Sequence, residues 1–192
     1  MKADLFDVNK FVKVNNLEEV TNPIIFNKGN IPSIDGLLST EIFGRTPEDR
    51  KTKWAYIDLG AKFFNPVVYK SLLRIDRRFE GIVNGLEFYN IDSKGDLIKS
   101  DEEHGYTGLD FLYKNWEKIV WKDRESNTAN ERIKLNRALK KNEVFIDKIP
   151  VCPAFYRDIN ISEQDTGKIS VGEINQIYSK IQIGRAHVWT PV

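Results

Sequence analysis

The residues of this chain best suited to chemistry are a group of cations in its second half. Nine lysines and arginines and five acids lie between Lys118 and Lys148, which gives this stretch a local charge of +4. Such side chains neutralise phosphates along a nucleic-acid backbone. A solvated helix face carries similar cations, so two helices with ordinary exposed faces explain the same pattern. The candidates for phosphate contacts here are Lys134, Arg137, Lys140 and Lys141.

Two amphipathic helices are expected to position these cations, one over residues 108–122 and one over residues 128–141. Apolar residues recur in both segments at the three- and four-residue spacing that places them on one helix face. The segment 87–103 has the opposite character, because it holds six acids and two lysines. A surface with this local charge of −4 repels phosphates, so we expect it to lie away from any bound nucleic acid.

The composition excludes several classes of protein. The 192 residues are 41% hydrophobic and have a net charge of +1, which favours a folded core and argues against nucleic-acid binding over the whole surface. Cys152 is the only cysteine, so an internal disulfide and a cysteine zinc site are excluded. No apolar run approaches the roughly 20 residues of a membrane span, and no export signal begins the chain. A cytoplasmic protein without membrane contact is expected.

The pattern of short apolar segments predicts an α+β fold, an irregular mixture of short strands and amphipathic helices. Residues 54–61 alternate between buried and exposed types as a strand does, and residues 144–151 read as a second strand. Asp35-Gly36 is a turn signal, because glycine tolerates a positive φ. The polar segment 46–53 is expected to be an exposed loop. No paired acids stand out, so a carboxylate-based hydrolase is poorly supported and no catalytic residue is assigned.

Three separated segments carry a resemblance to a known family. The sequence DGLLSTEIFGR at residues 35–45 resembles the "DGL…IFGP" segment near the start of the beta-prime subunit of multisubunit DNA-directed RNA polymerases. Residues 57–66 are similar to the family's "IELA" segment and its following proline. Residues 149–157 are similar to its "LPVLPPDLRP" segment, with Arg157 at the arginine. A fourth match, to "DLN.LY..I", begins at Glu173.

The resemblance implies the clamp base and the lid of such an enzyme. Residues 1–182 would form the N-terminal clamp region, and residues 154–170 would hold the lid, a loop that separates nascent RNA from template DNA. Arg157 and Lys168 then join the four cations above as candidate nucleic-acid contacts. The family's four-cysteine zinc module is missing after Gly44, as in the reduced, split subunits of some large bacteriophages. Host cytoplasm is the implied location if a phage encodes the chain.

The implied whole enzyme extends RNA with Mg²⁺ held by three aspartates of an "NADFDGD" loop, which this chain lacks. The implied partners are a beta-like subunit, a C-terminal beta-prime-like subunit, template DNA and nascent RNA, and the chain alone should be inactive. The alternative is a non-catalytic nucleic-acid-binding or structural module. Residues 183–192 resemble a translated sequencing adapter, so we expect them to be a non-native tail and the gene to have been cut near Gln182.

Overall fold

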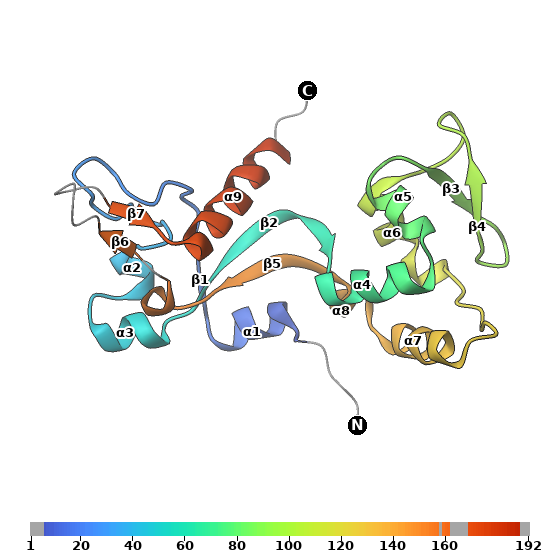
Figure 1. The fold of residues 1–192 in the computed structure, drawn as a ribbon, viewed down its shortest axis with the longest axis horizontal. Coiled ribbons are helices and arrows are strands. Elements are labelled where there is room, and N and C mark those ends of the chain that lie inside the picture. Colours follow the sequence, from blue (N-terminus) through green and yellow to red (C-terminus); the bar gives the residue numbers. More distant parts are fainter. Residues whose placement is uncertain (1–5, 158, 162–168, 189–192) are drawn as a thin grey trace. The chain divides into compact units, whose positions relative to one another are not determined.

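The computed structural model describes residues 6–157, 159–161 and 169–188 and confirms the mixed α+β fold (Figure 1). The chain divides into two compact units. Unit 1 comprises Lys62–Ile146 with the N-terminal residues up to Asp7, and unit 2 comprises Val8–Ala61 with the chain from Asp147 onward. No helix of the described residues has the length and apolar character needed to cross a membrane.

Unit 2 is built from short elements around one three-stranded sheet. The sheet has the order β1-β2-β5, and β1 pairs in parallel with the first residues of β2. The strands β2 and β5 begin or end in unit 1, so the polypeptide passes between the units along them. The elements are α1 (Val8–Val14), β1 (Glu18–Glu19), α2 (Thr40–Phe43), α3 (Pro47–Thr52), β2 (Ala55–Phe64), β5 (Phe145–Val151), η2 (Ala154–Tyr156), β6 (Ile159–Ile161), β7 (Ile169–Val171) and α9 (Glu173–Val188).

The core of unit 2 gathers the segments that carry the family resemblance. Leu37, Leu38 and Phe43 of the first segment pack with Ile57 of the second and Val151 of the third. All five side chains are buried. Tyr178 of the fourth segment packs against the same cluster. Pro66, the proline of the second segment, lies instead in unit 1, where it begins a helix.

The turn before α2 differs from its prediction in one respect. Asp35, not Gly36, has the positive φ, at 55°. Gly36 is required for space, because a Cβ there would lie 2.9 Å from the main-chain oxygen of Ile24 and 3.1 Å from that of Ser33. Asparagine and aspartate tolerate the left-handed region better than most residues, which allows Asp35 to take it. Gly44 has a φ of 81° and ends α2 as expected.

The polar segment after Gly44 is a helix, which corrects the prediction of a loop. Thr46 caps α3, because its hydroxyl accepts a hydrogen bond from the main-chain N–H of Asp49 at 3.1 Å. Pro47 occupies the first helical turn, where its missing N–H costs nothing. No residue of α3 is buried. Capping chemistry rather than an apolar stripe therefore specifies this helix.

Unit 1 combines five helices, a 3₁₀ turn and a hairpin in its described part. The hairpin β3–β4 is antiparallel, and residues 92–96 form its turn. The helix expected over residues 108–122 is shorter, because α6 and η1 end it at Lys118. The helix expected over residues 128–141 divides after Ala138. The elements are α4 (Pro66–Ile75), α5 (Arg78–Val83), β3 (Phe88–Ile91), β4 (Leu97–Ser100), α6 (Gly108–Asn115), η1 (Trp116–Lys118), α7 (Asn127–Ala138) and α8 (Lys141–Val144).

Aromatic rings form the centre of unit 1. Phe64 and Phe145, at the unit 1 ends of β2 and β5, stack with their ring centroids 4.7 Å apart. Trp116 meets both rings edge to face. Aromatic pairs of this kind add about 0.5–1.5 kcal/mol each beyond the burial of their area. The main-chain N–H of Asn65 donates to the carbonyl oxygen of Val144 at 2.8 Å and joins the ends of the two strands.

The predicted alternation of β2 holds in its first half. Ala55, Ile57 and Leu59 are buried, whereas the side chains between them are partly exposed. Gly60 interrupts the pattern with a φ of 69°. The carboxylate of Asp58 accepts the Gly60 N–H at 2.8 Å and fixes this irregular point. The alternation stops there because a positive φ turns the following side chains out of register.

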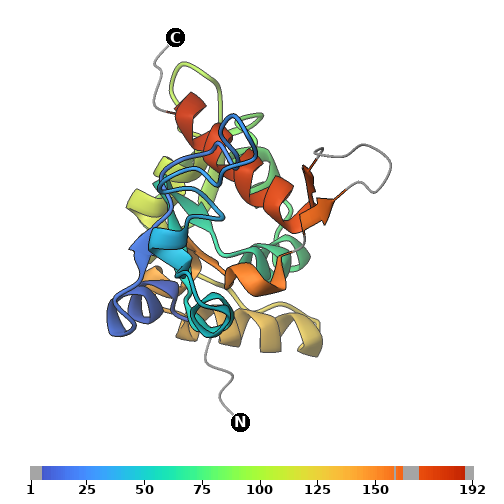
Figure 2. The same ribbon diagram turned by 90° about the vertical axis from the view of Figure 1, so that its left-hand side faces the viewer.

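Helix α9 crosses the segment that follows β1 (Figure 2). The hydroxyl of Ser179 donates to the carbonyl oxygen of Pro23, and the amide of Gln182 donates to that of Val20 at 2.9 Å. The helix continues to Val188. The first six residues of the expected tail, 183–188, are part of α9, and residues 189–192 lie outside the described part. The non-native origin of this tail stays a prediction.

Candidate nucleic-acid interface

The cations predicted near α7 are not equivalent. Lys134 is exposed on α7, whose inward face is formed by Ile133 and Asn136. Lys140 is exposed in the short connection between α7 and α8. Within the described ranges, neither of these two ammonium groups forms an ion pair. Both are therefore available to a polyanion.

The other two cations of this stretch already have partners. Arg137 forms an ion pair with Asp123 at 3.0 Å and donates to the main-chain oxygen of Trp121. The ammonium of Lys141 lies 4.0 Å from the ring centroid of Tyr113, a cation–π contact. A phosphate would compete with these contacts, so Arg137 and Lys141 are weaker candidates than Lys134 and Lys140.

Arg157 has a different place from the one predicted. Its side chain is 2% exposed and lies over the ring of Phe43, with 4.6 Å between guanidinium carbon and ring centroid. The guanidinium donates to the carbonyl oxygens of Cys152 and Leu37 and to the side-chain oxygen of Asn175. Burial lowers the pKa of Arg157 to about 10, so it stays charged at neutral pH. Arg157 cannot reach a phosphate, and we withdraw it from the candidate contacts.

The region expected to hold the lid is the antiparallel hairpin β6–β7. Ile159 pairs with Val171, and Ile161 pairs with Ile169. Arg157 precedes β6 by two residues, so the buried guanidinium anchors the base of this hairpin. Residues 162–168, and with them the predicted contact Lys168, lie outside the described residues. Phe155 and Tyr156 lie just before the hairpin and are exposed.

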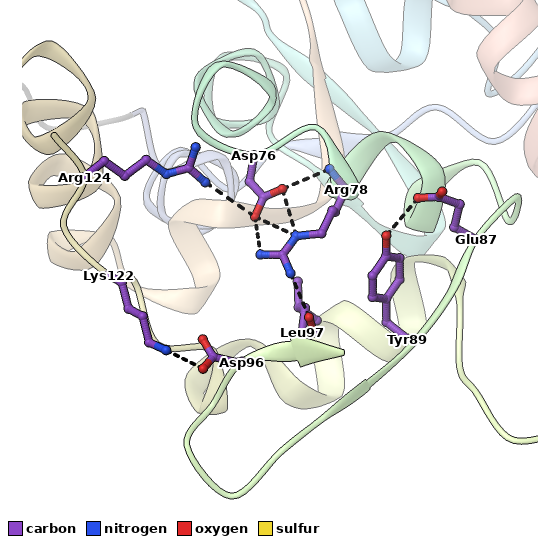
Figure 3. A network of polar contacts seen from close by, with 8 residues as sticks. All are labelled: Asp76, Arg78, Glu87, Tyr89, Asp96, Leu97, Lys122 and Arg124. Atoms are coloured by element: carbon purple, nitrogen blue, oxygen red, sulfur yellow. Dashed lines mark hydrogen bonds and ion pairs between the residues drawn. The ribbon is translucent and has the colours of Figure 1, made fainter. Parts of the chain in front are cut away.

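A second polar site, which the sequence did not reveal, lies in unit 1. Asp76 ends α4, and Arg78 begins α5. The guanidinium of Arg78 donates to both carboxylate oxygens of Asp76 and to the carbonyl oxygen of Leu97 (Figure 3). Arg124 approaches the same carboxylate at 3.9 Å, and Lys122 pairs with Asp96. The lysine and the second arginine come from the segment before α7.

The contacts of this network favour the charged forms of Asp76 and Arg78. Burial alone would raise the pKa of Asp76, but the hydrogen bonds and charge of Arg78, together with the charge of Arg124, hold it below its ordinary value. Asp76 likewise raises the pKa of Arg78. Both groups are therefore charged at neutral pH, and the network is a set of ion pairs rather than a proton-transfer site. Asp76 and Arg78 are only two residues apart, but Leu97 and Arg124 reach them from distant segments, so no local motif predicted the whole network.

Among the described residues, no group of three or more histidines, cysteines or acids is arranged to hold a metal ion. The magnesium implied for the whole enzyme therefore finds no set of ligands in the described part, and no step through a metal is derived for it. Comparison with known proteins finds no family model that matches the chain and no curated protein with significant similarity to it.

Proposed function

We propose that this chain is the clamp base and lid of a beta-prime-like subunit of a DNA-directed RNA polymerase. The observation that carries the proposal is that all the resembling segments, except the end of the second at Pro66, contribute to one core. The turn at Gly36, the strand at Ile57 and the segment ending at Arg157 surround the same buried cluster. Segments that resemble one family in sequence order and also meet in space support a common origin better than three isolated matches.

The hairpin β6–β7 supports the second half of the proposal. It projects from the anchored segment 149–157, where the resemblance expects a lid, and Ile159 at its base is partly exposed. A hairpin fixed at its base by a buried arginine is a stiff support for a loop that must hold two strands apart. In the complete enzyme, magnesium and its aspartates, the beta-like subunit and the rest of the beta-prime-like subunit would be supplied by other segments or chains in the host cytoplasm.

The proposal is tested by crosslinking to a transcription fork. A photoreactive amino acid is placed at Ser170, which is exposed on β7. The chain is mixed with an RNA–DNA hybrid whose upstream RNA end is unpaired, and the crosslinked strand positions are mapped. We expect crosslinks at the junction where RNA leaves the template. The matched control carries the same group at Ile98, which is 51% exposed on the acidic hairpin β3–β4, and should give none.

The same experiment also distinguishes the polymerase proposal from the alternative, a non-catalytic nucleic-acid-binding or structural module. Equal crosslinking to a fork and to plain duplex DNA, with an affinity that falls steeply with salt, would favour a general nucleic-acid-binding module. No nucleic-acid contact from either position would remove the polymerase assignment and the nucleic-acid-binding alternative, and would leave a structural module. A measurable rate of nucleotide addition by the chain alone would contradict its expected role as a non-catalytic part.

A further inference from the structure

Unit 1 contains a cavity of about 190 Å³ beside the polar network described above. Its walls come from the α4–α5 turn, the β3–β4 hairpin, the segment that follows η1, and α7. Pockets for drug-sized ligands usually measure roughly 300–1,000 Å³. A cavity of this size accommodates a fragment such as a single ring system. All the residues that line it belong to one compact unit.

One wall of the cavity is aromatic and apolar. Phe79 and Trp121 both line it, and their rings stack with 5.6 Å between centroids and 19° between planes. Trp121 is half-buried, and Ile119 and Ile133 extend the apolar surface. Flat aromatic ligands stack on such walls, and nucleobases do so whatever their sequence.

The polar part of the lining is neutral overall. It holds the cations Arg78, Lys122 and Arg124, and an equal number of carboxylates, from Asp76, Asp96 and Asp123. A lining without excess positive charge does not favour a phosphate. It suits an uncharged ligand whose edge carries both hydrogen-bond donors and acceptors.

Arg124 is the cation most ready to bind such an edge. Its main chain is held by Asn130, whose side chain accepts from the Arg124 N–H at 2.7 Å and donates to the Arg124 oxygen at 2.8 Å. Its guanidinium forms an ion pair with the Asp76 carboxylate at 3.9 Å (Figure 3), which is too long for a hydrogen bond. The backbone of Arg124 is thus fixed, while its guanidinium is held only by one long ion pair.

Lys122, which lines the cavity with Arg124, is held only by an exposed ion pair. Lys122 binds the carboxylate of Asp96, and their side chains are 60% and 35% exposed. Exposed ion pairs of this kind contribute little to stability, so a ligand can replace this one at little cost.

We propose that this cavity binds one unpaired guanine base. Guanine presents the acceptors O6 and N7, the pair that arginine and lysine recognise most often, and its amino group is a donor that a carboxylate accepts. Arg124 and Lys122 would bind the acceptor edge, Asp96 would accept from the amino group, and Trp121 would stack on the ring. Adenine carries an amino group where guanine has O6, so it places a donor against the cations. The site does not depend on the polymerase proposal.

The test uses guanosine, which has the base and no phosphate, with the full chain. Titration is followed by tryptophan fluorescence, and the Trp121→Phe variant identifies the reporter. We expect saturable quenching, at least about tenfold weaker binding in Arg124→Gln, and no more than about twofold change in the matched control Arg74→Gln. Arg74 is exposed on α4 and does not line the cavity. Circular dichroism checks that both variants fold.

Several results would overturn the proposal. The proposal is wrong if guanosine shows no saturable binding at millimolar concentration, or if adenosine binds as tightly as guanosine. It is also wrong if the Arg124→Gln variant binds guanosine with unchanged affinity. Lys122→Gln gives an independent check and should also weaken binding. Comparing guanosine monophosphate with a single-stranded oligonucleotide that contains one guanine shows whether the base comes from a free nucleotide or from a strand. Tenfold tighter binding of the oligonucleotide supports a guanine within a strand, and equal affinity supports a free nucleotide.

Discussion

The guanidinium of Arg157 donates a hydrogen bond to the main-chain oxygen of Leu37, although the two residues are 120 positions apart in the chain. Leu37 follows the turn that begins the first resembling segment, and Arg157 ends the third. One buried side chain therefore ties the start of unit 2 to the base of the hairpin β6–β7.

Replacing Arg157 by alanine should destabilise unit 2 by about 3 kcal/mol or more, because three acceptors lose a buried donor and each costs about 1–3 kcal/mol. Arg157→Lys should also destabilise, because a single ammonium cannot replace a planar guanidinium that binds Cys152, Asn175 and Leu37 at once. The free energy of unfolding in urea is the measurement. Arg45→Ala, at an exposed arginine after α2, serves as control and should change it by less than about 0.5 kcal/mol.

Gly36→Ala should destabilise unit 2 by roughly 1–3 kcal/mol, because the new methyl group meets main-chain atoms that cannot move independently. Gly184→Ala in α9 is the matched control. No atom lies within 4 Å of a Cβ at that position, so helix propensity should make this change neutral or stabilising by up to about 1 kcal/mol. Thermal unfolding of the two variants side by side tests this, and an equal effect of both would contradict the close approach at Gly36.

Because of Asp76, the stability of unit 1 should depend on pH in the acid range. Its pKa in the folded chain is lower than its ordinary value of 3.8. The stabilisation is therefore complete above the pKa of the unfolded chain and is lost as the pH falls through the lower, folded value. In Asp76→Asn the loss of stability between about pH 5 and pH 2 should be smaller than in the parent.

The acid dependence is measured by urea unfolding at a series of pH values. Glu125→Gln, at an exposed acid before α7, is the control and should keep the slope of the parent. If Asp76→Asn and the parent lose stability in parallel on acidification, the ion pairs of Asp76 with Arg78 and Arg124 do not contribute as the geometry indicates.

Lys134 and Lys140 should carry the phosphate contacts of unit 1. Replacing both by glutamine should weaken binding to an RNA–DNA hybrid and reduce the slope of log affinity against log salt by about 1.5–2, because each lysine releases close to one counterion. Arg137→Gln should change the slope less, since Arg137 is paired with Asp123. The measurement is fluorescence anisotropy of a labelled hybrid at several salt concentrations. Equal slopes for parent and double variant would exclude these lysines from the interface.

Periodicity predicted the elements whose contacts are local. The alternation at Ala55, Ile57 and Leu59 was sufficient for β2, because burial on one face imposes this pattern directly. The helix α3 was missed since its polar sequence was interpreted by composition. Thr46 and Pro47 together with the acids of the first turn form a start signal that could have predicted it.

The sites were harder to predict than the elements. Arg157 was expected at a surface because the resemblance gives its position in the sequence and not its environment. Its burial depends on Leu37 and Asn175, which only the folded chain brings to it. The cavity of unit 1 combines four segments, and no spacing rule links Asp76 to Arg124. The exposure of Lys134 and Lys140 follows from local pattern, and their role as phosphate contacts stays a prediction.

The passage of β2 and β5 between the two units has a consequence for synthesis. Residues 62–146 leave the ribosome as one continuous piece, so unit 1 can fold as soon as it has emerged. Unit 2 must wait, because Val151 and Arg157 are needed to close the core around Leu37. The early half of unit 2 therefore leaves the ribosome before its core can close, and Leu37, Leu38 and Phe43 stay exposed until the last part of the core has been made.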